Sequence, residues 1–337
     1  MKTGNDAVLD PVVRKISGIN PADSPAGDTV GRRRLVTHVE NALQRYQEIL
    51  EHGVACRGLS TGFRRLDVMT NGLLPGMVYV IASRPSMGKT TLLLNILSRV
   101  GIEQQTPSMF FSGNLTISQI VDRLIFNRAM APLCAFSNPG YLPNKADLLR
   151  IRKCAHDLAI SGLVLDDSRD MTIEAIVAKA REERSRTGIG FIAIDHLHLI
   201  RSESTHPGTS RKREMTGVIR AIKILAQELE LPILVSAQLK RRADGRLPRS
   251  RDIRESGAIE NEADFVGLLH RVGSIKDQVC FNLLIAKNNN GPSGTVTLFL
   301  TREMQFEEGP RLHNEEEEMT RAWTDYRFEK DFPPEAD

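Results

Sequence analysis

The sequence predicts an α/β domain in which helices cover both faces of a mainly parallel β-sheet, followed by an antiparallel C-terminal extension. Three observations lead to this prediction. Short apolar runs rich in β-branched residues alternate with helical patterns through the middle of the chain. One run leads through a short loop directly into a helical pattern. The last runs follow one another without long helices, which is typical of antiparallel strands.

The expected strands are near-continuous apolar stretches. Strands with helices on both sides carry little alternation, because both of their faces are buried. The strands that alternate with helical patterns cover residues 77–82, 108–112, 163–165, 191–194 and 233–236. The strands that follow cover residues 265–269, 281–286 and 295–300.

Composition divides the chain into four parts. Residues 1–30 lack lasting periodicity and predict a flexible arm, and residues 31–57 contain an amphipathic helix. The apolar stripe of this helix consists of Leu35, Val39, Leu43, Tyr46 and Leu50. The main domain is expected over residues 58–310. Residues 311–337 form an acidic and aromatic tail, which is either a solvated extension or a site for a partner.

The bulk numbers restrict the class of protein. A chain of 337 residues, 41% hydrophobic and 26% charged, can bury a sizeable core. The net charge is only +3, so attraction to nucleic acid must come from local basic clusters. The four cysteines lie far apart without metal-ligand spacing, which favours a reduced, cytoplasmic protein. No apolar stretch approaches the roughly 18 residues of a membrane span, so no membrane association is expected.

Residues 83–91 connect the first expected strand to a helical pattern. They are Ser83, Arg84, Pro85, Ser86, Met87, Gly88, Lys89, Thr90 and Thr91. Gly88, Lys89 and Thr90 match the phosphate-binding pattern G-x-x-x-x-G-K-[ST], while Ser83 stands where the first Gly is expected. Backbone N–H groups would cradle the phosphates, the Lys89 ammonium would reach the outer ones, and the Thr90 hydroxyl would ligate Mg²⁺. The stretch predicts binding of a nucleoside triphosphate.

Two later strands are expected to end in polar residues beside this loop. Asp195 follows an apolar run and would hold Mg²⁺ together with Thr90. Gln238 ends another run and could sense the γ-phosphate. His196 and His198 form an H-x-H pair, but a transition-metal site is disfavoured because no third ligand is evident.

A basic segment follows Gln238. Its candidate nucleic-acid contacts are Lys240, Arg241, Arg242, Arg246 and Arg249. Because Gly245 and Pro248 interrupt the segment, it is expected to be a phosphate-contacting loop. The alternative is a solvated charged loop.

The motifs occur in a characteristic order. They are Thr61-Gly62-Phe63, Leu66-Asp67, Asn71-Gly72-Leu73, Pro75-Gly76, residues 84–90, Ile194-Asp195, residues 236–239, residues 254–260, Asn290-Gly291-Pro292 and Gly294-Thr295-Val296. Over about residues 34–306, the chain resembles the helicase domain of DnaB-type replicative helicases. The resemblance implies a RecA-like core, a homo-hexameric ring around single-stranded DNA, ATP and Mg²⁺ bound between subunits, and a partner that loads the ring.

The resemblance also implies roles for single residues. Lys89 and Thr90 would bind phosphate and Mg²⁺, and Asp195 would support the ion. Gln238 would couple the γ-phosphate to the basic segment that follows it. Lys287 would contribute to the finger that reaches a neighbour's nucleotide. The basic segment would face DNA, and the amphipathic helix within residues 31–57 would be the linker helix that packs on the next subunit.

Three departures from the family pattern affect what can be expected. About thirty residues precede the linker helix where the family has a primase-binding domain, so primase binding in the family's manner is not expected. Asn114 stands where the family has a Glu that activates water, and Asn289 stands where it has an Arg finger. The basic segment is also shorter than the family's usual loop.

The leading hypothesis is an ATP-dependent DNA helicase of replication that translocates on single-stranded DNA, with weakened hydrolysis. The alternative is an ATP-binding ring or helicase-associated subunit that binds single-stranded DNA without efficient unwinding. A RecA-like strand-exchange or signalling ATPase is a third class, against which the linker helix and Arg254-Glu255-Ser256-Gly257 argue.

Overall fold

The computed structural model describes residues 39, 40, 43, 57–131, 144–204, 210–240, 246–275 and 278–309. The chain divides into two compact units, Met1–Ala55 and Cys56–Asp337. Within the first unit Val39, Glu40 and Leu43 are described, and all three are helical. The arm, the rest of the amphipathic helix and the tail lie outside the described residues, and the domain boundaries stay predictions. In the described part, no helix is long and apolar enough to cross a membrane.

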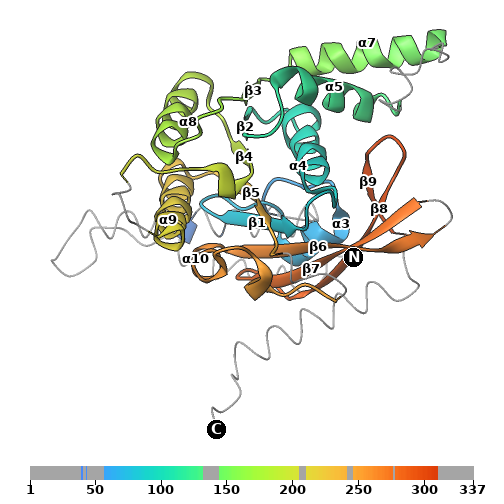
Figure 1. Cartoon of the computed structure of the whole chain (residues 1–337). Helices are drawn as coiled ribbons and strands as arrows, with labels where there is room; N and C mark the ends of the chain where they lie inside the picture. Colours follow the sequence, from blue (N-terminus) through green and yellow to red (C-terminus); the bar gives the residue numbers. More distant parts are fainter. Residues whose placement is uncertain are drawn as a thin grey trace, which may run out of the picture. The chain divides into compact units, whose positions relative to one another are not determined.

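The described strands of the second unit form one sheet in the order β3-β2-β4-β5-β1-β6-β7-β8-β9. Their bounds are Val78–Ser83 (β1), Ser108–Ser112 (β2), Leu163–Asp166 (β3), Phe191–Asp195 (β4), Ile233–Gln238 (β5), Phe265–Ile275 (β6), Gln278–Asn288 (β7), Gly294–Leu300 (β8) and Phe306–Glu308 (β9). Strands β1 to β6 pair in parallel, and β6 to β9 pair antiparallel. The predicted fold class is confirmed (Figure 1).

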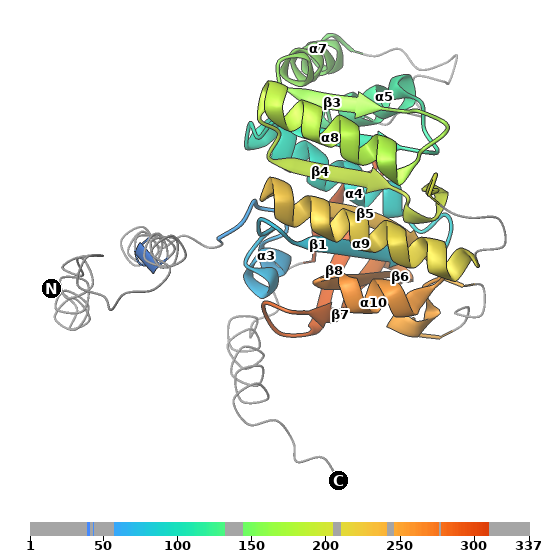
Figure 2. The same cartoon turned by 90° about the vertical axis from the view of Figure 1, so that its left-hand side faces the viewer.

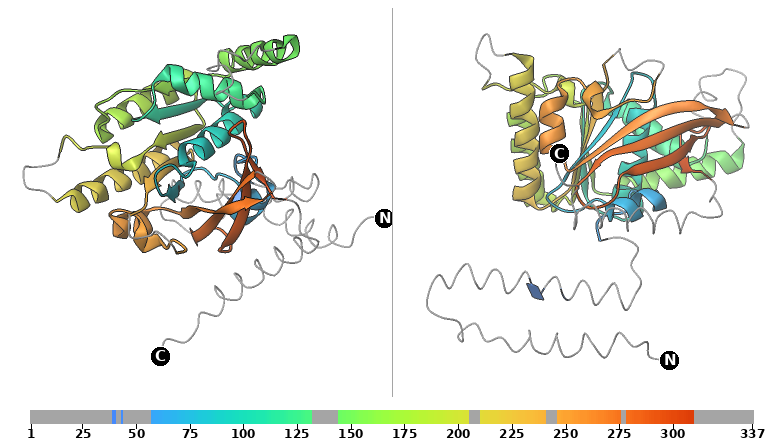
Figure 3. Two further views of the ribbon diagram at one scale, coloured as in Figure 1. Left: turned by 45° about the vertical axis from the view of Figure 1, so that its right-hand side comes forward. Right: turned by 90° about the horizontal axis from the view of Figure 1, so that it is seen from below.

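Helices cover both faces of the parallel part of the sheet. Their bounds are Arg64–Thr70 (α3), Lys89–Ser98 (α4), Ile117–Arg128 (α5), Lys145–Ala159 (α7), Ile173–Thr187 (α8), Arg211–Leu229 (α9) and Ser256–Glu262 (α10). Figure 2 shows α8 and α9 in front of the sheet, and Figure 3 shows α4 and α5 on the other side. The side chains of β1 alternate between the two layers, with Val80 in one core cluster and Ile81 in the other.

The strand ends differ from the prediction where the sheet leaves the two helical layers. Strand β6 continues past residue 269 to Ile275, because it pairs there with β7 as an antiparallel ribbon. Arg271 and Val272 are exposed in this ribbon, so the continuous apolar pattern stops before the strand does. Strand β9 has only three residues and was not predicted.

The helices begin in two different ways. Thr116, Thr172 and Ser210 cap α5, α8 and α9 by accepting a hydrogen bond from a first-turn N–H group. Helix α4 begins after Gly88 without a side-chain cap. The first N–H groups of α4 therefore remain available to an anion at the carboxyl edge of β1.

Candidate nucleotide site and nucleic-acid segment

The loop between β1 and α4 has the backbone shape of a phosphate cradle. Ser86 and Gly88 have positive φ angles of 61° and 74°. A Cβ at Gly88 would lie 2.9 Å from Cζ of Phe306, so both conformation and space favour glycine there. Ser83 is fully buried as the last residue of β1 and is not among the positive-φ residues. Serine is therefore tolerated where the pattern has its first Gly.

Lys89 lies at the start of α4 and is 9% exposed. Burial lowers the pKa of its ammonium group, and the negative charge of Asp195 opposes this effect. A buried cation at the N-terminus of an uncapped helix is suited to bind a polyphosphate.

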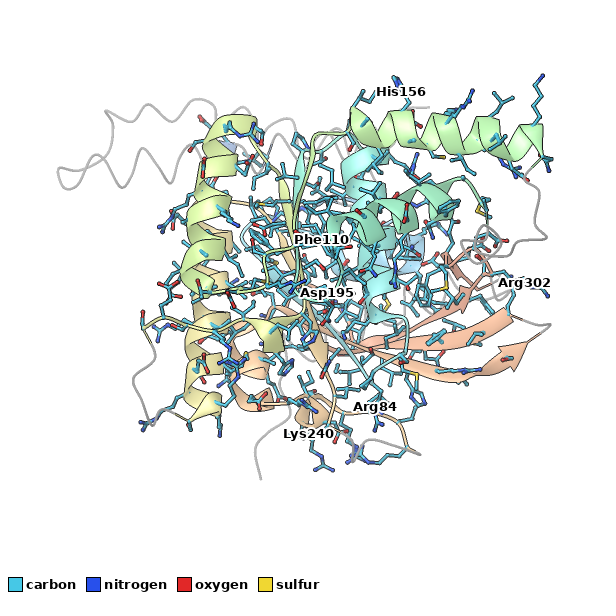
Figure 4. The ribbon with its side chains drawn as sticks, turned by 45° about the horizontal axis from the view of Figure 1, so that its top comes forward. Arg84, Phe110, His156, Asp195, Lys240 and Arg302 are labelled. Carbon is cyan, nitrogen blue, oxygen red and sulfur yellow. The ribbon has the colours of Figure 1, made fainter. Side chains whose placement is uncertain are left out.

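Thr90 and Asp195 are in direct contact, as the sequence predicted for a shared ion. The Thr90 hydroxyl donates to Oδ2 of Asp195 at 2.6 Å. The Ser236 hydroxyl donates to the other carboxylate oxygen, Oδ1. Asp195 has no exposed surface, so these two hydroxyl groups fix its orientation. In Figure 4, Asp195 lies inside the molecule, with Arg84 and Lys240 on one side of it.

The residues around Asp195 fit Mg²⁺. A hydroxyl and a carboxylate are hard oxygen ligands, and Mg²⁺ usually takes one or two carboxylates and completes its shell with water and phosphate oxygens. Within the described residues, no group of three or more His, Cys, Asp or Glu side chains forms an all-protein metal site. Thr90 and Asp195 suit an ion that arrives with a nucleotide, whose phosphate charge it would neutralise.

Gln238 lies beside the P-loop and contacts both histidines of the H-x-H pair. Its position pairs with Ser83 in the register of β5 and β1. Its side-chain Nε2 lies 3.2 Å from Nε2 of His196, and its backbone N–H donates to Nδ1 of His198 at 3.3 Å. Burial, followed by the positive charge of Lys89, lowers the pKa of His196 to about 4. His196 is therefore neutral at pH 7.

Asn114 follows β2 at the same edge of the sheet. Ser112, the last residue of β2, pairs with Asp195 in register, and the Gly113 N–H donates to the Asp195 carbonyl at 2.8 Å. Asn114 comes next and is exposed. The loop after β2 is thus next to the nucleotide site, with an amide where the resemblance led us to look for a carboxylate.

Lys287 and Asn289 lie at the opposite edge of the sheet from the P-loop. The Asn289 N–H donates to the carbonyl of Asp264 at 2.9 Å, and the Asp264 carboxylate accepts from the N–H of Val78, the first residue of β1. The Lys287 ammonium donates to the carbonyl of Glu260 at 2.7 Å. Strand β1 runs from one edge to the other and, at about 3.3 Å per residue, separates them by roughly 17 Å. Lys287 therefore cannot reach the phosphate site of its own chain.

The basic segment is closed at its base. Leu239 and Ile253 form an antiparallel bridge, and the Lys240 N–H donates to the Asp252 carbonyl at 2.7 Å. Arg246 forms a forked pair with Asp252, with Nη1 to Oδ2 at 2.8 Å and Nη2 to Oδ1 at 2.6 Å. This pairing lowers the pKa of Asp252, so the Arg246 charge is partly compensated within the chain.

The other predicted contacts of this segment differ in whether the structure describes them. Lys240 and Arg249 are exposed, as nucleic-acid contacts must be. Arg241 and Arg242 lie outside the described residues. The assignment of all five side chains to nucleic-acid binding stays a prediction.

A cavity lies beside α4, next to the phosphate cradle. Its volume is about 260 Å³, and its lining includes Thr91 and Leu94 of α4, Phe126 of α5 and Met304 of the β8–β9 turn. Thr91 directly follows Thr90 in α4, so the cavity extends along α4 from the end of the P-loop.

Sequence reasoning did not find the roles of three residues in this region. Ser236 orients Asp195, Phe306 packs against Gly88, and His198 joins Gln238 to the segment before α10. A hydroxyl residue within an otherwise apolar buried strand was the available signal for Ser236. Phe306 gave no such signal, because its contact crosses from the C-terminal strands to the P-loop.

The profile of the DnaB-like helicase C terminal domain matches residues 58–308. The chain belongs to this family. This membership confirms the resemblance stated from the motifs.

Named DnaB relatives agree with the profile. The chain is 39% identical over 247 residues to the replicative DNA helicase DnaB of Leifsonia xyli, covering 71% of this chain and 53% of the relative. It is 34% identical over 260 residues to the replicative DNA helicase DnaB of Geobacillus stearothermophilus, covering 73% and 55%. The chain thus spans about half the length of the curated relatives it matches.

Solved structures of the DnaB family share the RecA-like fold. One solved ATPase domain aligns with a TM-score of 0.73 at 25% identity, covering 80% of this chain and 98% of that one. A DnaB-like replicative helicase, whose structure concerns its interactions with primase, aligns with a TM-score of 0.70 at 22% identity, covering 90% and 76%. The second likeness supports the fold alone.

Proposed function

We propose that this DnaB-family chain binds ATP with Mg²⁺ and acts as a replicative DNA helicase that translocates on single-stranded DNA as a hexameric ring. The contact between Thr90 and Asp195 at the base of the P-loop carries the proposal. It brings together a hydroxyl and a carboxylate from two distant parts of the sequence in the arrangement that a Mg²⁺-nucleotide requires. The names of the relatives supply the reaction and the nucleic acid.

The proposed nucleotide site uses the carboxyl edge of the sheet. Residues 83–91 cradle the phosphates, Lys89 neutralises their charge, and Thr90 with Asp195 holds the ion. Ser236 keeps Asp195 in position, and Gln238 senses the γ-phosphate. The nucleoside extends into the cavity between α4 and α5, where Leu94 and Phe126 supply apolar contacts.

The position of Lys287 supports a composite site. The Lys287 ammonium is at the sheet edge opposite the P-loop of its own chain. If it stabilises a transferring phosphoryl group, that group must be bound to another copy of the chain. A closed ring with nucleotide between subunits satisfies this requirement.

Asn114 and Asn289 favour slow ATP hydrolysis and therefore support a second candidate function. An amide cannot accept a proton from water as a carboxylate can, and general-base catalysis contributes about 10²- to 10⁴-fold. An arginine finger contributes about 10³- to 10⁵-fold, and Lys287 replaces only part of that charge. The second candidate is a ring or helicase-associated subunit that binds ATP and single-stranded DNA without efficient unwinding.

The remaining partners follow from the family. The basic segment from Lys240 to Arg249 contacts DNA phosphates, and a loader places the ring on DNA. Primase binding in the family's manner is not proposed. A replication protein of this kind would work in the cytoplasm.

The experiment measures Mg²⁺-dependent ATP binding and steady-state ATPase activity, with and without single-stranded DNA. We expect binding in the low micromolar to millimolar range, its loss in Lys89→Ala, and a slow ATPase that DNA stimulates. Absence of ATP binding in the unaltered chain would exclude both candidate functions. Binding without DNA-stimulated turnover would select the second.

A further inference from the structure

His198 joins the nucleotide edge of the sheet to the segment that leads into α10. Its ring is in the short 3-10 turn Leu197–Leu199, which follows Asp195 and His196. The His198 side chain is 8% exposed. From this buried position it contacts the end of β5 on one side and the start of α10 on the other.

The hydrogen bonds fix the protonation of the ring. The backbone N–H of Gln238 can only donate, so Nδ1 of His198, 3.3 Å away, accepts. The proton of the neutral ring is therefore on Nε2. This nitrogen donates to the carbonyl of Arg254 at 3.2 Å and also lies 3.2 Å from Oε2 of Glu255. The ring is thus a directed bridge from Gln238 to Arg254 and Glu255.

The bridge closes the base of the basic segment. The Arg254 N–H donates to the Gln238 carbonyl at 3.1 Å, and Leu239 pairs with Ile253. A displacement of Gln238 therefore acts on both arms of the segment that begins at Lys240. Glu255, the residue before α10, has a positive φ of 53°, a conformation that non-glycine residues rarely adopt without support. His198 supplies such support through its contact with the Glu255 carboxylate.

Arg211 holds the backbone of the turn that carries His198. Nη2 of Arg211, at the start of α9, donates to the carbonyls of His198 and Ile200 at 2.9 Å each. The turn that carries His198 is therefore held at its backbone while its side chain spans the gap. Motion at Gln238 is more readily passed to Arg254 than absorbed by the turn.

We propose that His198 is a positioning residue that couples nucleotide binding at the P-loop to nucleic-acid binding by the described part of the basic segment, Lys240 and residues 246–254. The proposal rests on the proposed function, since it requires ATP at one end and DNA at the other. His198 touches neither ligand. It transmits the position of Gln238, which depends on the γ-phosphate, to the backbone of Arg254 and Glu255.

The test measures coupling separately from affinity, in the full chain. Binding of a fluorescent oligo-dT is measured by anisotropy with and without a non-hydrolysable ATP analogue and Mg²⁺. Binding of a fluorescent ATP analogue is measured with and without DNA. Coupled sites typically change each other's affinity about 5- to 150-fold. The factor by which nucleotide changes DNA affinity must equal the factor by which DNA changes nucleotide affinity. For His198→Phe, which keeps an aromatic ring but removes both nitrogens, we expect this factor to fall at least about fivefold.

The separate affinities should change by less than about threefold, because Lys89, Thr90, Asp195 and Lys240 are untouched. His198→Gln, whose amide can still donate to the Arg254 carbonyl, should restore part of the coupling. His156→Phe is the matched control, because His156 is exposed on α7, away from Asp195 (Figure 4). If His198→Phe unfolds at lower temperature, the comparison of His198→Gln with the control carries the test.

Three results would overturn the proposal. Coupling in His198→Phe could equal that of His156→Phe, or the unaltered chain could bind both ligands without coupling. Parallel loss of both separate affinities in His198→Phe would assign His198 a merely structural role. Failure of the proposed function is distinguishable, because the unaltered chain would then bind no ATP analogue even without DNA.

Discussion

The two edges of the parallel sheet differ in how completely they form a site. The carboxyl edge brings together the P-loop, Asp195, Ser236 and Gln238, and Asp195 is fully buried and held by two hydroxyl groups. The opposite edge presents Lys287 and Asn289, which bond to backbone and side-chain oxygens of Glu260 and Asp264. The carboxyl edge carries the candidate phosphate and Mg²⁺ ligands within a single chain. At the opposite edge, Lys287 lies too far from the P-loop of its own chain to act on a nucleotide bound there.

The residue types at these positions separate ground-state binding from turnover. The proposed ligands of phosphate and Mg²⁺, Lys89, Thr90 and Asp195, have the residue types that the family pattern predicts. The groups that would act on water or on the transition state, at positions 114 and 289, are both asparagine. Changes at Lys89, Thr90 and Asp195 should therefore affect affinity. Changes at Asn114, at the carboxyl edge, and at Lys287, at the opposite edge, should affect rate.

Lys287→Ala should produce the largest effect on rate. An arginine finger contributes about 10³- to 10⁵-fold, and Lys287 supplies only part of that charge, so we expect a loss of up to about 10³-fold in single-turnover ATP hydrolysis. The dissociation constant for ATP should change by less than about fivefold, since Lys287 does not reach the phosphate site of its own chain. Lys153→Ala on the exposed face of α7 is the control. Equal losses of affinity and rate would contradict the distinction between the edges.

Asn114→Glu should raise the rate without raising affinity. A carboxylate in the exposed loop after β2 can accept a proton from the attacking water, for which about 10²-fold is expected. The measurement is DNA-stimulated ATPase activity at saturating ATP. Asn114→Gln, which adds the same length without the charge, is the matched control and should remain slow. A rate that rises equally in both variants would show that side-chain length, not basicity, limits turnover.

Ser236→Ala should weaken Mg²⁺-dependent ATP binding. The variant removes the hydroxyl that donates to Oδ1 of Asp195, and a hydrogen bond to a charged group is worth about 1.5–3 kcal/mol, or roughly 10- to 100-fold in affinity. Isothermal titration with and without Mg²⁺ measures the effect. Ser112→Ala, on strand β2 at the other side of β4, should change affinity much less, because the Ser112 hydroxyl bonds to Leu115 instead. Equal effects of the two variants would remove the orienting role of Ser236.

Glu174→Gln should have the smallest effect, because Glu174, in the first turn of α8, bonds to Ser202, Glu203 and Ser204 and not to the nucleotide-site residues described above. Burial raises the pKa of Glu174, but hydrogen bonds from its own backbone, from Ser202 and Ser204 and from the Glu203 N–H outweigh it and lower the pKa to about 2. The stabilisation is therefore complete above the ordinary pKa of 4.5 and is lost as pH falls towards 2. Because Glu174 is only partly buried, we expect under about 1 kcal/mol at pH 7.

Chemical denaturation at pH 7 and at pH 3 tests this expectation. The difference in the free energy of unfolding between Glu174→Gln and the unaltered chain should shrink at the lower pH. Glu182→Gln on the same helix, α8, is the control. A difference that grows on acidification would reverse the sign of the argument.

The sequence predicted the carboxyl edge well, because the signals there are local. The apolar runs of β1, β2, β4 and β5 sit between helical patterns, and each ends within two residues of its prediction. The Thr90–Asp195 contact followed from the ordinary geometry of parallel strands. Serine can replace glycine at position 83 because the positive φ angles of the loop fall at Ser86 and Gly88. The sequence alone does not show these backbone angles.

The rest required register and three-dimensional proximity. The place of Lys287 at the opposite edge follows from the antiparallel pairing of β6 with β7, which no local pattern encodes. The forked pair of Arg246 with Asp252 and the bridge through His198 connect residues whose spacing carries no signal. The short strand β9 lacks the length that a periodic pattern needs.

Mixing two inactive variants tests the composite site most directly. Lys89→Ala lacks its own phosphate site but retains Lys287, whereas Lys287→Ala retains the phosphate site but lacks the cation for a neighbour. We predict that each variant alone is nearly inactive in single-turnover ATP hydrolysis, and that their mixture, after subunit exchange, regains about a quarter to a half of the unaltered activity. A mixture no more active than the separate variants would contradict the claim that one chain binds and another completes the site.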